Sequence, residues 1–269
     1  MRGVRVKVVA IMGSPHKGNS LRRVNVIEGK LRELGDVEFE YLHLKDMDVQ
    51  PCRGCFKCFM RGEGSCPIDD DVASIVEKMD AADGVIFASP VYAMHISYLL
   101  KTLIDRMGYV FHRPRFFGKY ALAVAVAGSP GLDETLKYIE GAEMIMGFHV
   151  VDKLGYIDPP KGTPLRAIMQ RRDRTDEVVA RFYQAMRTNQ ARRLRFRDYL
   201  WFHTTKAVYQ RMEPMNPRDY AYWKERGWLE KDARFFYDNV RGNPLSNAMG
   251  RFIGWMMGRQ VDKALAGST

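Results

Sequence analysis

The cysteines are the residues whose type and spacing most directly indicate chemistry. All of them fall within one short segment, spaced C-x2-C-x2-C-x7-C: Cys52, Cys55, Cys58 and Cys66. Three thiols at this pitch can converge on one metal centre, and a fourth on a glycine-containing return completes the four thiolates of a [4Fe–4S] cluster. The pattern therefore favours an iron–sulfur centre.

Two alternatives use the same four residues. Four thiolates also suit a structural zinc ion, although zinc sites usually pair their ligands as two separated C-x2-C knuckles. The cysteines could instead be reduced thiols, or a redox-active dithiol, in a protein of the cytoplasm. The spacing alone leaves these alternatives open.

A loop rich in glycine, serine and asparagine follows the first predicted strand. It reads GSPHKGNSL over residues 13–21 and passes directly into a predicted helix. Its backbone N–H groups, hydroxyls and helix N-terminus suit an anion. It lacks the Lys-Ser/Thr ending of a nucleoside-triphosphate loop and the G-x-G-x-x-G of a dinucleotide fold. The loop predicts a cradle for a monophosphate such as that of flavin mononucleotide (FMN), with an ordinary well-capped turn as the alternative.

Two more loops follow the next predicted strands of the sheet interior. Residues 88–95 read ASPVYAMH, and residues 127–131 read AGSPG. Because the carboxyl ends of parallel strands meet at one edge of a sheet, all three loops can lie together there. They could hold a planar ring between backbone amides and an aromatic side chain.

The elements that must position these loops alternate along the first 160 residues. Apolar runs, as expected of strands buried on both faces, are separated by amphipathic helical patterns. We predict strands over 4–12, 37–44, 84–90, 120–127 and 149–157, and helices over 20–34, 70–82, 97–111 and 134–146. Residues 175–188 read as a final helix of this domain or as the start of a linker. This alternation predicts an α/β fold with a flavodoxin-like, five-stranded, parallel, doubly wound sheet.

The positive charge of the chain belongs to its C-terminal part. Residues 1–160 contain 20 Lys and Arg against 21 Asp and Glu, whereas residues 161–269 contain 22 against 11. Residues 191–269 are basic and aromatic and show no strand alternation. We therefore predict an FMN-binding domain over 1–190, with the cysteine loop at 51–68, followed by a helical extension over 191–269.

The extension has several candidate roles. It could pack on a neighbouring subunit or cover the flavin, as its many aromatic residues would suit an interface. A peripheral membrane contact is a second role, because apolar residues lie among cations near the C-terminus: Phe252, Ile253, Trp255 and Met256 beside Arg251, Arg259 and Lys263. Nucleic acid binding is disfavoured, since no recognised fold accompanies the arginines of residues 192–197.

Two features of the sequence bear on where in the cell the protein is found. No run of about 18 apolar residues occurs, as a membrane-spanning helix would need. The N-terminus leads straight into a predicted strand and does not read as a cleavable signal. We therefore expect a cytoplasmic protein.

The three loops and the cysteine segment together resemble the NADPH-dependent FMN reductase family, and within it the iron–sulfur flavoprotein branch. The segments that carry the resemblance are GSPHKGNSL, SPVYAMHISYLLKTLIDR and PCRGCFKC…CPIDDD. It spans roughly residues 4–158. The resemblance implies a flavodoxin-like fold, bound FMN, one [4Fe–4S] cluster, and assembly as a homodimer or homotetramer.

The resemblance also assigns residues to these cofactors. Those implied to hold the phosphate are Ser14, His16, Gly18, Asn19, Ser20 and Leu21. Those implied to line the flavin ring are Pro90, Val91, Tyr92, Ala93 and Met94, with Gly128, Ser129 and Gly131 on the other side. The cluster ligands would be Cys52, Cys55, Cys58 and Cys66. No catalytic side chain is nominated, because the flavin itself carries the redox chemistry.

The expected activity is that of an FMN-dependent oxidoreductase. It would move electrons between a [4Fe–4S] cluster, FMN and either a small acceptor or a redox partner protein, with NAD(P)H as a candidate donor. Two alternatives are a cluster-free NAD(P)H-dependent FMN or quinone reductase and a non-enzymatic, flavodoxin-like electron carrier.

Overall fold

The structure, a computed structural model, describes residues 5–128, 130–159, 171–189 and 191–267. The predicted site residue Ser129 and the first position of the first predicted strand lie outside the described residues. The chain divides into two compact units: Met1–Arg53 with Ile68–Gln190, and Gly54–Pro67 with Ala191–Thr269. The segment that carries three of the four cysteines therefore groups with the C-terminal extension.

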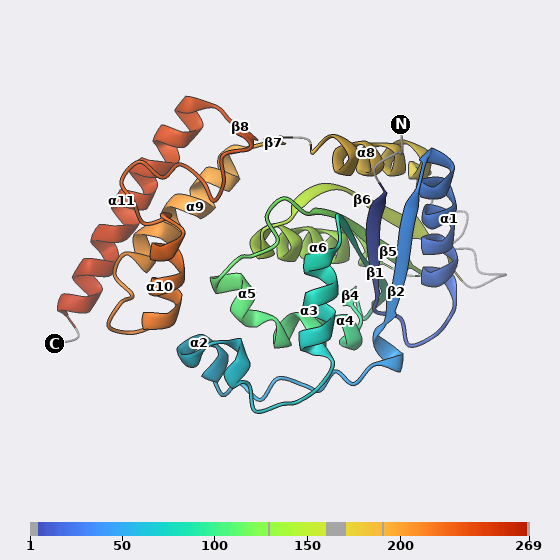
Figure 1. Cartoon of the computed structure of the whole chain (residues 1–269), viewed down its shortest axis with the longest axis horizontal. Helices are drawn as coiled ribbons and strands as arrows, with labels where there is room; N and C mark the ends of the chain where they lie inside the picture. Colours follow the sequence, from blue (N-terminus) through green and yellow to red (C-terminus); the bar gives the residue numbers. More distant parts are fainter. Residues whose placement is uncertain (1–4, 129, 160–170, 190, 268–269) are drawn as a thin grey trace. The chain divides into compact units, whose positions relative to one another are not determined.

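The first unit contains a parallel sheet. Its strands run in the order β2-β1-β3-β5-β6, and a short β4 pairs antiparallel with β3 (Figure 1). The strands are β1 (Val6–Met12), β2 (Val37–His43), β3 (Gly84–Tyr92), β4 (His95–Ile96), β5 (Tyr120–Ala127) and β6 (His149–Ile157). This order confirms the predicted flavodoxin-like α/β fold.

The α-helices of the first unit lie in the predicted helical segments or within two residues of them. They are α1 (Asn19–Leu34), α3 (Val72–Ala81), α4 (Tyr98–Arg106), α5 (Gly108–His112), α6 (Leu132–Met146) and α8 (Thr175–Thr188). The 3-10 turn η1 (Leu44–Asp46) was not predicted. The helix predicted over 97–111 is two helices, because the chain leaves the helical path at Met107 and restarts at Gly108. Glycine is a poor helix residue, which favours a break at this point.

The sheet is buried on both faces, as its apolar strands require. Every position of β5 is buried. On one face, β-strand residues pack against α1 and α8 through side chains such as Ile27, Leu31 and Phe182. Helices α3 and α6 bury their own apolar residues against strands of the sheet, with α6 packed on β5 and β6.

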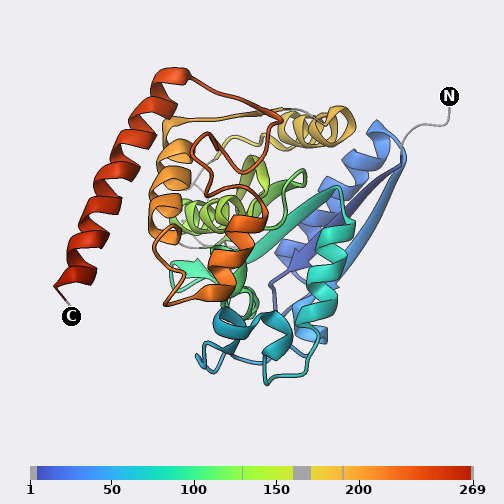
Figure 2. The same cartoon turned by 60° about the vertical axis from the view of Figure 1, so that its left-hand side comes forward.

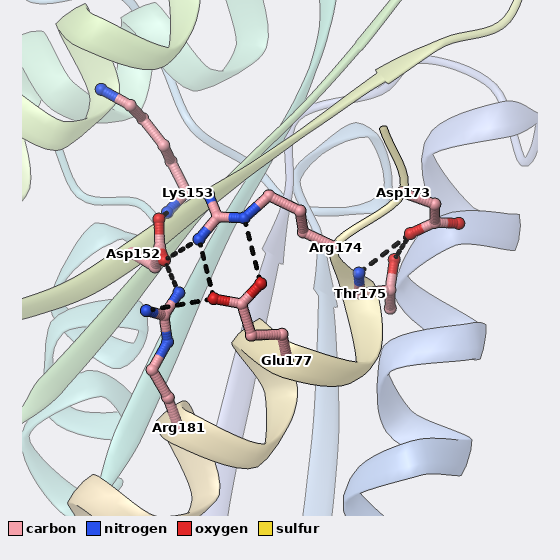
Figure 3. Close-up of polar contacts among 7 residues, drawn as sticks. All are labelled: Asp152, Lys153, Asp173, Arg174, Thr175, Glu177 and Arg181. Carbon is pink, nitrogen blue, oxygen red and sulfur yellow. Dashed lines mark hydrogen bonds and ion pairs between the residues drawn. The ribbon is translucent and has the colours of Figure 1, made fainter. Parts of the chain in front are cut away.

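An ion-pair network fastens α8 to the edge strand β6 (Figure 3). Arg174 and Arg181 both contact the carboxylate of Asp152, with Arg174 at 3.0 Å, and both also pair with Glu177. Asp173 accepts hydrogen bonds from the backbone N–H (2.9 Å) and the hydroxyl of the first residue of α8. Because these groups are partly or largely exposed to solvent, each pair adds little to stability, and together they orient the helix.

The second unit is helical, which confirms the predicted extension. It contains α2 (Lys57–Arg61), η2 (Glu63–Ser65), α9 (Phe196–Tyr209), α10 (Pro217–Glu225) and α11 (Pro244–Ala266), with a two-stranded parallel pair of β7 (Arg192–Arg193) and β8 (Val240–Arg241). Its core is aromatic. Trp223 lies edge-on to Trp228 at 5.2 Å between ring centroids and is stacked with Tyr209 at 4.6 Å.

Helix α11 lies directly alongside α9 (Figure 2). A glycine seam allows this close approach: Gly250, Gly254 and Gly258 are the buried residues of α11. A Cβ atom on Gly254 would lie 2.6 Å from the backbone oxygen of His203. Within the described residues, no helix is both long enough and apolar enough to cross a bilayer.

Candidate functional site

A buried hydrogen-bond network joins the carboxyl ends of β1 and β3. The Gly13 N–H donates to the Ala88 carbonyl (2.8 Å), and the Ser97 hydroxyl donates to the Gly13 carbonyl. The Ser97 N–H donates to the Ser89 hydroxyl (2.9 Å). A Cβ on Gly13 would lie 2.8 Å from that of Leu100, so only glycine fits where β1 meets α4. Neither Ser89 nor Ser97 was among the predicted site residues. The position of Ser97 immediately before an amphipathic helix, as its N-cap, could have indicated its role.

The loop after β1 leaves the start of α1 open. Ser14 folds the loop locally, since its hydroxyl donates to the His16 carbonyl (2.8 Å). Ser14 and Ser20 are buried, while His16 is exposed. Gly18 precedes α1 without a side-chain cap, and no acidic residue occupies the first turn. The uncapped N–H groups and the helix dipole therefore favour an anion at this end.

The far side of this loop is tied to the end of β6. The side-chain amide of Asn19 donates to the Asp158 carbonyl (3.5 Å), and Arg22 lies 3.3 Å from the Asp158 carboxylate. Leu21 is half-buried and packs against the hydrophobic core, so it anchors the end of the loop to the core. Asp158 was not among the predicted site residues. Its position directly after the parallel strand β6 could have indicated that it lies near the site.

A strained hairpin turn joins β3 to β4. Tyr92 pairs with His95, which leaves Ala93 and Met94 as the two turn residues, with φ of 47° and 66°. Positive φ at both central positions is the type I′ arrangement, which normally takes Asn-Gly. A larger residue there costs on the order of 1 kcal/mol, and such strain concentrates at functional sites.

The loop after β5 packs on this turn. Gly131 has φ of 108°, and a Cβ there would lie 2.4 Å from the Cα of Met94. Pro90 and Val91 are buried beneath the turn, whereas Tyr92 and Met94 are 43% and 57% exposed. Gly128 is half-buried. The structure thus brings the second and third predicted loops together, and it presents apolar side chains beside them.

A buried ion pair holds the chain on both sides of the cysteine segment. The side chains of Arg106 and Asp70 are 4% and 2% exposed. Arg106 also donates to the Gln50 carbonyl (3.0 Å), and Asp70 accepts from the N–H groups of Gln50 (2.9 Å) and Val72 (3.3 Å). Burial alone would raise the pKa of Asp70, but these hydrogen bonds, chiefly that from Arg106, outweigh it and lower the pKa.

We call the chain at Gln50 and at Asp70 the two stems of the cysteine segment. The four cysteines lie between these stems, and none of them is in a disulfide. Cys52 and Cys55 are exposed, and Cys58 and Cys66 are half-buried. As a donor set, four thiols suit an iron–sulfur cluster. Among the described residues, however, no three His, Cys, Asp or Glu side chains lie together as a metal-binding group. The residue types therefore fit a cluster, while the side chains as placed do not converge on one.

The backbone around Cys55 turns sharply. Gly54 and Phe56 both have positive φ, 61° and 57°. A left-handed conformation is unfavourable for phenylalanine, so this turn is strained in the same way as the turn after β3. Further along, Gly62 has φ of 98°, and its nearest neighbour in the extension is the Arg218 side chain of α10. The cysteine segment thus packs within the second unit.

Three loops at the carboxyl edge of the sheet, with an uncapped helix start among them, place the chain in the class of flavodoxin-like proteins. The chain belongs to the NADPH-dependent FMN reductase family, whose model matches residues 6–159, more than half of the chain. This confirms the family that the sequence indicated.

Several curated relatives carry the name iron-sulfur flavoprotein. One from Methanocaldococcus jannaschii is 39% identical over 154 residues, 54% of this chain and 76% of that protein. One from Methanosarcina thermophila is 34% identical over 150 residues, 54% of this chain and 77% of that protein. One from Archaeoglobus fulgidus is 39% identical over 101 residues, 38% of this chain, and there the match spans only about half (48%) of the relative.

A solved structure supports the fold. The crystal structure of RosB with bound 8-demethyl-8-formylriboflavin-5'-phosphate has a TM-score of 0.52 and 14% sequence identity, and covers 68% of this chain and 79% of its own. At this identity the likeness shows the fold alone.

Proposed function

We propose that this chain is an iron–sulfur flavoprotein. It is an FMN-dependent oxidoreductase that moves electrons between FMN, a [4Fe–4S] cluster on the four cysteines, and a small acceptor or a redox partner protein. One observation carries the proposal: in a member of an FMN reductase family, all cysteines of the chain lie in one segment whose two stems are fixed by the buried Asp70–Arg106 pair. The names of the relatives support the same reading.

The residues of the three loops take separate roles toward FMN. The N–H groups at the start of α1, with Ser14, His16, Asn19 and Ser20, would bind the phosphate. The turn of residues 90–94 and the loop of residues 128–131 would hold the ring between them, because Gly131 brings their backbones into contact. When bound, FMN exchanges electrons in pairs or singly, and a cluster exchanges them singly. The chain itself contributes binding, orientation and exclusion of water.

The cysteine segment would hold the cluster through Cys52, Cys55, Cys58 and Cys66. Its fit rests on donor type and on the two positive-φ residues that turn the chain sharply around Cys55. The ligands would have to close around the metal centre from the positions described above. Cys66, which follows the longest gap, is the ligand whose replacement tests this most sharply.

Two alternatives share the same FMN site. A cluster-free NAD(P)H-dependent FMN or quinone reductase would need only the first unit's loops. A non-enzymatic electron carrier would exchange electrons with redox proteins without turnover of a small substrate. We also propose a cytoplasmic location and a homodimeric or homotetrameric assembly, both as consequences of family membership.

Turnover assays separate the reductase from the carrier. The anaerobically purified full-length chain, loaded with FMN, is mixed with NADPH and a small quinone, and NADPH consumption is followed. Continuous consumption that requires both FMN and quinone supports the oxidoreductase. Reduction of the bound flavin by a ferredoxin alone, with no turnover of NADPH or NADH, would support the carrier and overturn the enzymatic proposal.

A further inference from the structure

The outer face of α11 is apolar along most of its length. The side chains of Leu245, Met249, Phe252 and Met256 are 43–75% exposed. Their spacing of four, three and four residues places them on one side of the helix, opposite the glycine seam that packs on α9. Trp255 is also exposed and stacks near Phe252 at 6.0 Å. The helix is therefore apolar on its outer side as well as its inner one, which an isolated surface helix rarely is.

The charges around this face are almost entirely positive. Asp262, the only acidic residue of α11, is paired with Arg211. Arg251, Arg259 and Lys263 have no ion pair with another residue of the described ranges, and Arg259 lies 5.1 Å from the centroid of the Trp255 ring. A cationic face whose one carboxylate is already neutralised has a net attraction for anions.

A cationic groove lies beside the N-terminal half of α11. Its volume is about 480 Å³, and its lining residues are Tyr199, Arg234, Gly242, Pro244, Asn247, Ala248 and Arg251. Arg234, like Arg251, makes no ion pair within the part of the chain that the structure describes. Two unpaired guanidinium groups beside an amide and a phenol suit a phosphate group.

These features distinguish between two occupants of the apolar face. A second copy of α11 would bring the same cations against each other and offer only Asp262 to meet them, a carboxylate that already pairs with Arg211. A bilayer with anionic lipids offers both an apolar interior for the Leu, Met, Phe and Trp side chains and phosphate groups for the cations. The charge pattern favours the bilayer.

We propose that α11 is an interfacial helix that docks this protein on an anionic membrane surface. Leu245, Met249, Phe252 and Met256 enter the boundary between headgroups and acyl chains, while Arg259 and Lys263 remain at the headgroups. Trp255 lies at the interface, where its ring is apolar and its indole N–H stays polar. The groove at Arg234 and Arg251 receives a lipid phosphate. The helix lies on the membrane and does not span it.

Vesicle binding by the full-length, cofactor-loaded protein tests this proposal. The protein is sedimented with vesicles of phosphatidylglycerol and phosphatidylcholine, and with vesicles of phosphatidylcholine alone. We expect binding to the anionic vesicles that falls with added salt, since surface charges are screened. A blue shift of tryptophan emission on binding should vanish in Trp255→Phe, which keeps an aromatic ring and still binds.

Matched variants identify the surface that binds. Replacing Phe252 and Met256 together by Ser should lower the vesicle partition coefficient by about tenfold or more, because exposed apolar area is removed. Replacing Arg259 and Lys263 by Gln should lower it about fivefold per cation, for anionic vesicles only. The control is Val26→Ser on α1, which is comparably exposed and should change nothing.

Three results would overturn the proposal. The first is no binding to anionic vesicles by the unmodified protein. The second is equal binding to neutral and anionic vesicles, which would remove the role of the cations. The third is an oligomer that the Phe252 and Met256 variant dissociates while vesicle binding stays unchanged, which would assign the face to a second copy of the chain. Both double variants change exposed side chains only, and an unchanged helical circular-dichroism signal with an unchanged unfolding midpoint verifies that the second unit still folds.

Discussion

The two compact units of the chain differ in what their cores are made of. The first buries aliphatic side chains on both faces of a parallel sheet, in strands such as β5 that have no exposed position. The second buries aromatic rings among short helices, with Trp223, Trp228 and Phe202 at its centre. The first core is thus formed between a sheet and helices, and the second mainly by contacts between aromatic rings.

The family match covers the two units unequally. The family model matches residues 6–159, so it includes the cysteine segment but none of the extension. Yet the cysteine segment groups with the extension in space and not with the sheet that surrounds it in sequence. The loops predicted to bind FMN therefore follow strands of the first unit, while residues 54–67, with three of the four cysteines, group with residues beyond the family match.

The largest expected effect tests whether the first unit fixes the stems of the cysteine segment. Asp70→Asn leaves Arg106 buried without a counter-charge, which should lower the free energy of unfolding by about 3–5 kcal/mol. The control, Asp105→Asn, breaks an exposed pair with Lys101 in α4 and should cost at most about 0.5 kcal/mol. Urea unfolding at neutral pH measures both; equal small losses would contradict the role of the buried pair.

The pH dependence of the same pair has a definite sign. The pKa of Asp70 is lowered in the folded chain, so its stabilising contribution is present at neutral pH. That contribution is lost as the pH falls below the ordinary value of 3.8 and through the folded pKa. The Asn variant should lack this loss.

The next effect concerns the contact between two FMN loops. Gly131→Ala introduces a Cβ against the backbone of Met94 at a left-handed position, at a cost of about 2–3 kcal/mol. We expect the dissociation constant for FMN, measured by flavin fluorescence, to rise by more than about tenfold. Gly141→Ala, in the open part of α6, is the control: it should leave FMN affinity unchanged and stabilise the helix by up to about 1 kcal/mol. Unchanged affinity in Gly131→Ala would sink the assignment of this loop.

One buried carboxyl of the first unit should have the opposite pH dependence to Asp70, because its pKa is raised and not lowered. Glu143 of α6 is fully buried, and neither of its carboxylate oxygens has a hydrogen-bond partner among the residues that the structure describes. Burial, with a smaller contribution from Glu140, raises its pKa well above 4.5, so the folded chain keeps a proton that the unfolded chain releases. Stability should therefore fall as the pH rises from about 4.5 toward the raised pKa.

Replacing this carboxyl by an apolar side chain tests that account. Glu143→Met should raise the free energy of unfolding at neutral pH by about 1–2 kcal/mol and abolish the decline with pH. Thermal unfolding at a series of pH values measures both quantities. If Glu143→Met were less stable than the unmodified protein and kept the same pH profile, Glu143 would not be a protonated carboxyl without a partner.

The smallest effect probes the second unit through its cysteine segment. Gly62 has φ of 98°, so Gly62→Ala should cost about 1 kcal/mol and weaken the packing of this segment on α10. Gly64→Ala, two residues on, meets no neighbouring atom and should be nearly neutral. Protection of the segment from limited proteolysis measures the difference; identical cleavage of the two variants would refute the packing.

The features that could be predicted from the sequence are those encoded in short-range patterns of residues. The bounds of β5, β6 and α8 were predicted to the residue, because apolar runs and amphipathic periods are local patterns. The strained turn at Ala93 and Met94 was not predicted as a hairpin, since neither residue favours positive φ. The three FMN loops were predicted to meet because parallel strands end at one edge.

Contacts between distant segments left no such signal. The pair of Asp70 and Arg106 joins the loop before α3 to the last residue of α4 across 36 positions, and the aspartate run of residues 69–71 gave no indication that one member was buried. The packing of Gly62 near Arg218 joins residues still further apart. The cysteine spacing predicted a cluster, but not the placement of the thiols, because ligand convergence depends on a metal centre that the backbone alone does not fix.

The most direct test of the central claim is the iron, sulfide and FMN content of the chain purified without oxygen. We expect about four irons and four sulfides per chain beside one FMN, as one [4Fe–4S] cluster requires. In Cys58→Ser and Cys66→Ser we expect loss of iron and sulfide with FMN retained. FMN with no iron in the unmodified protein, or zinc in its place, would contradict this claim.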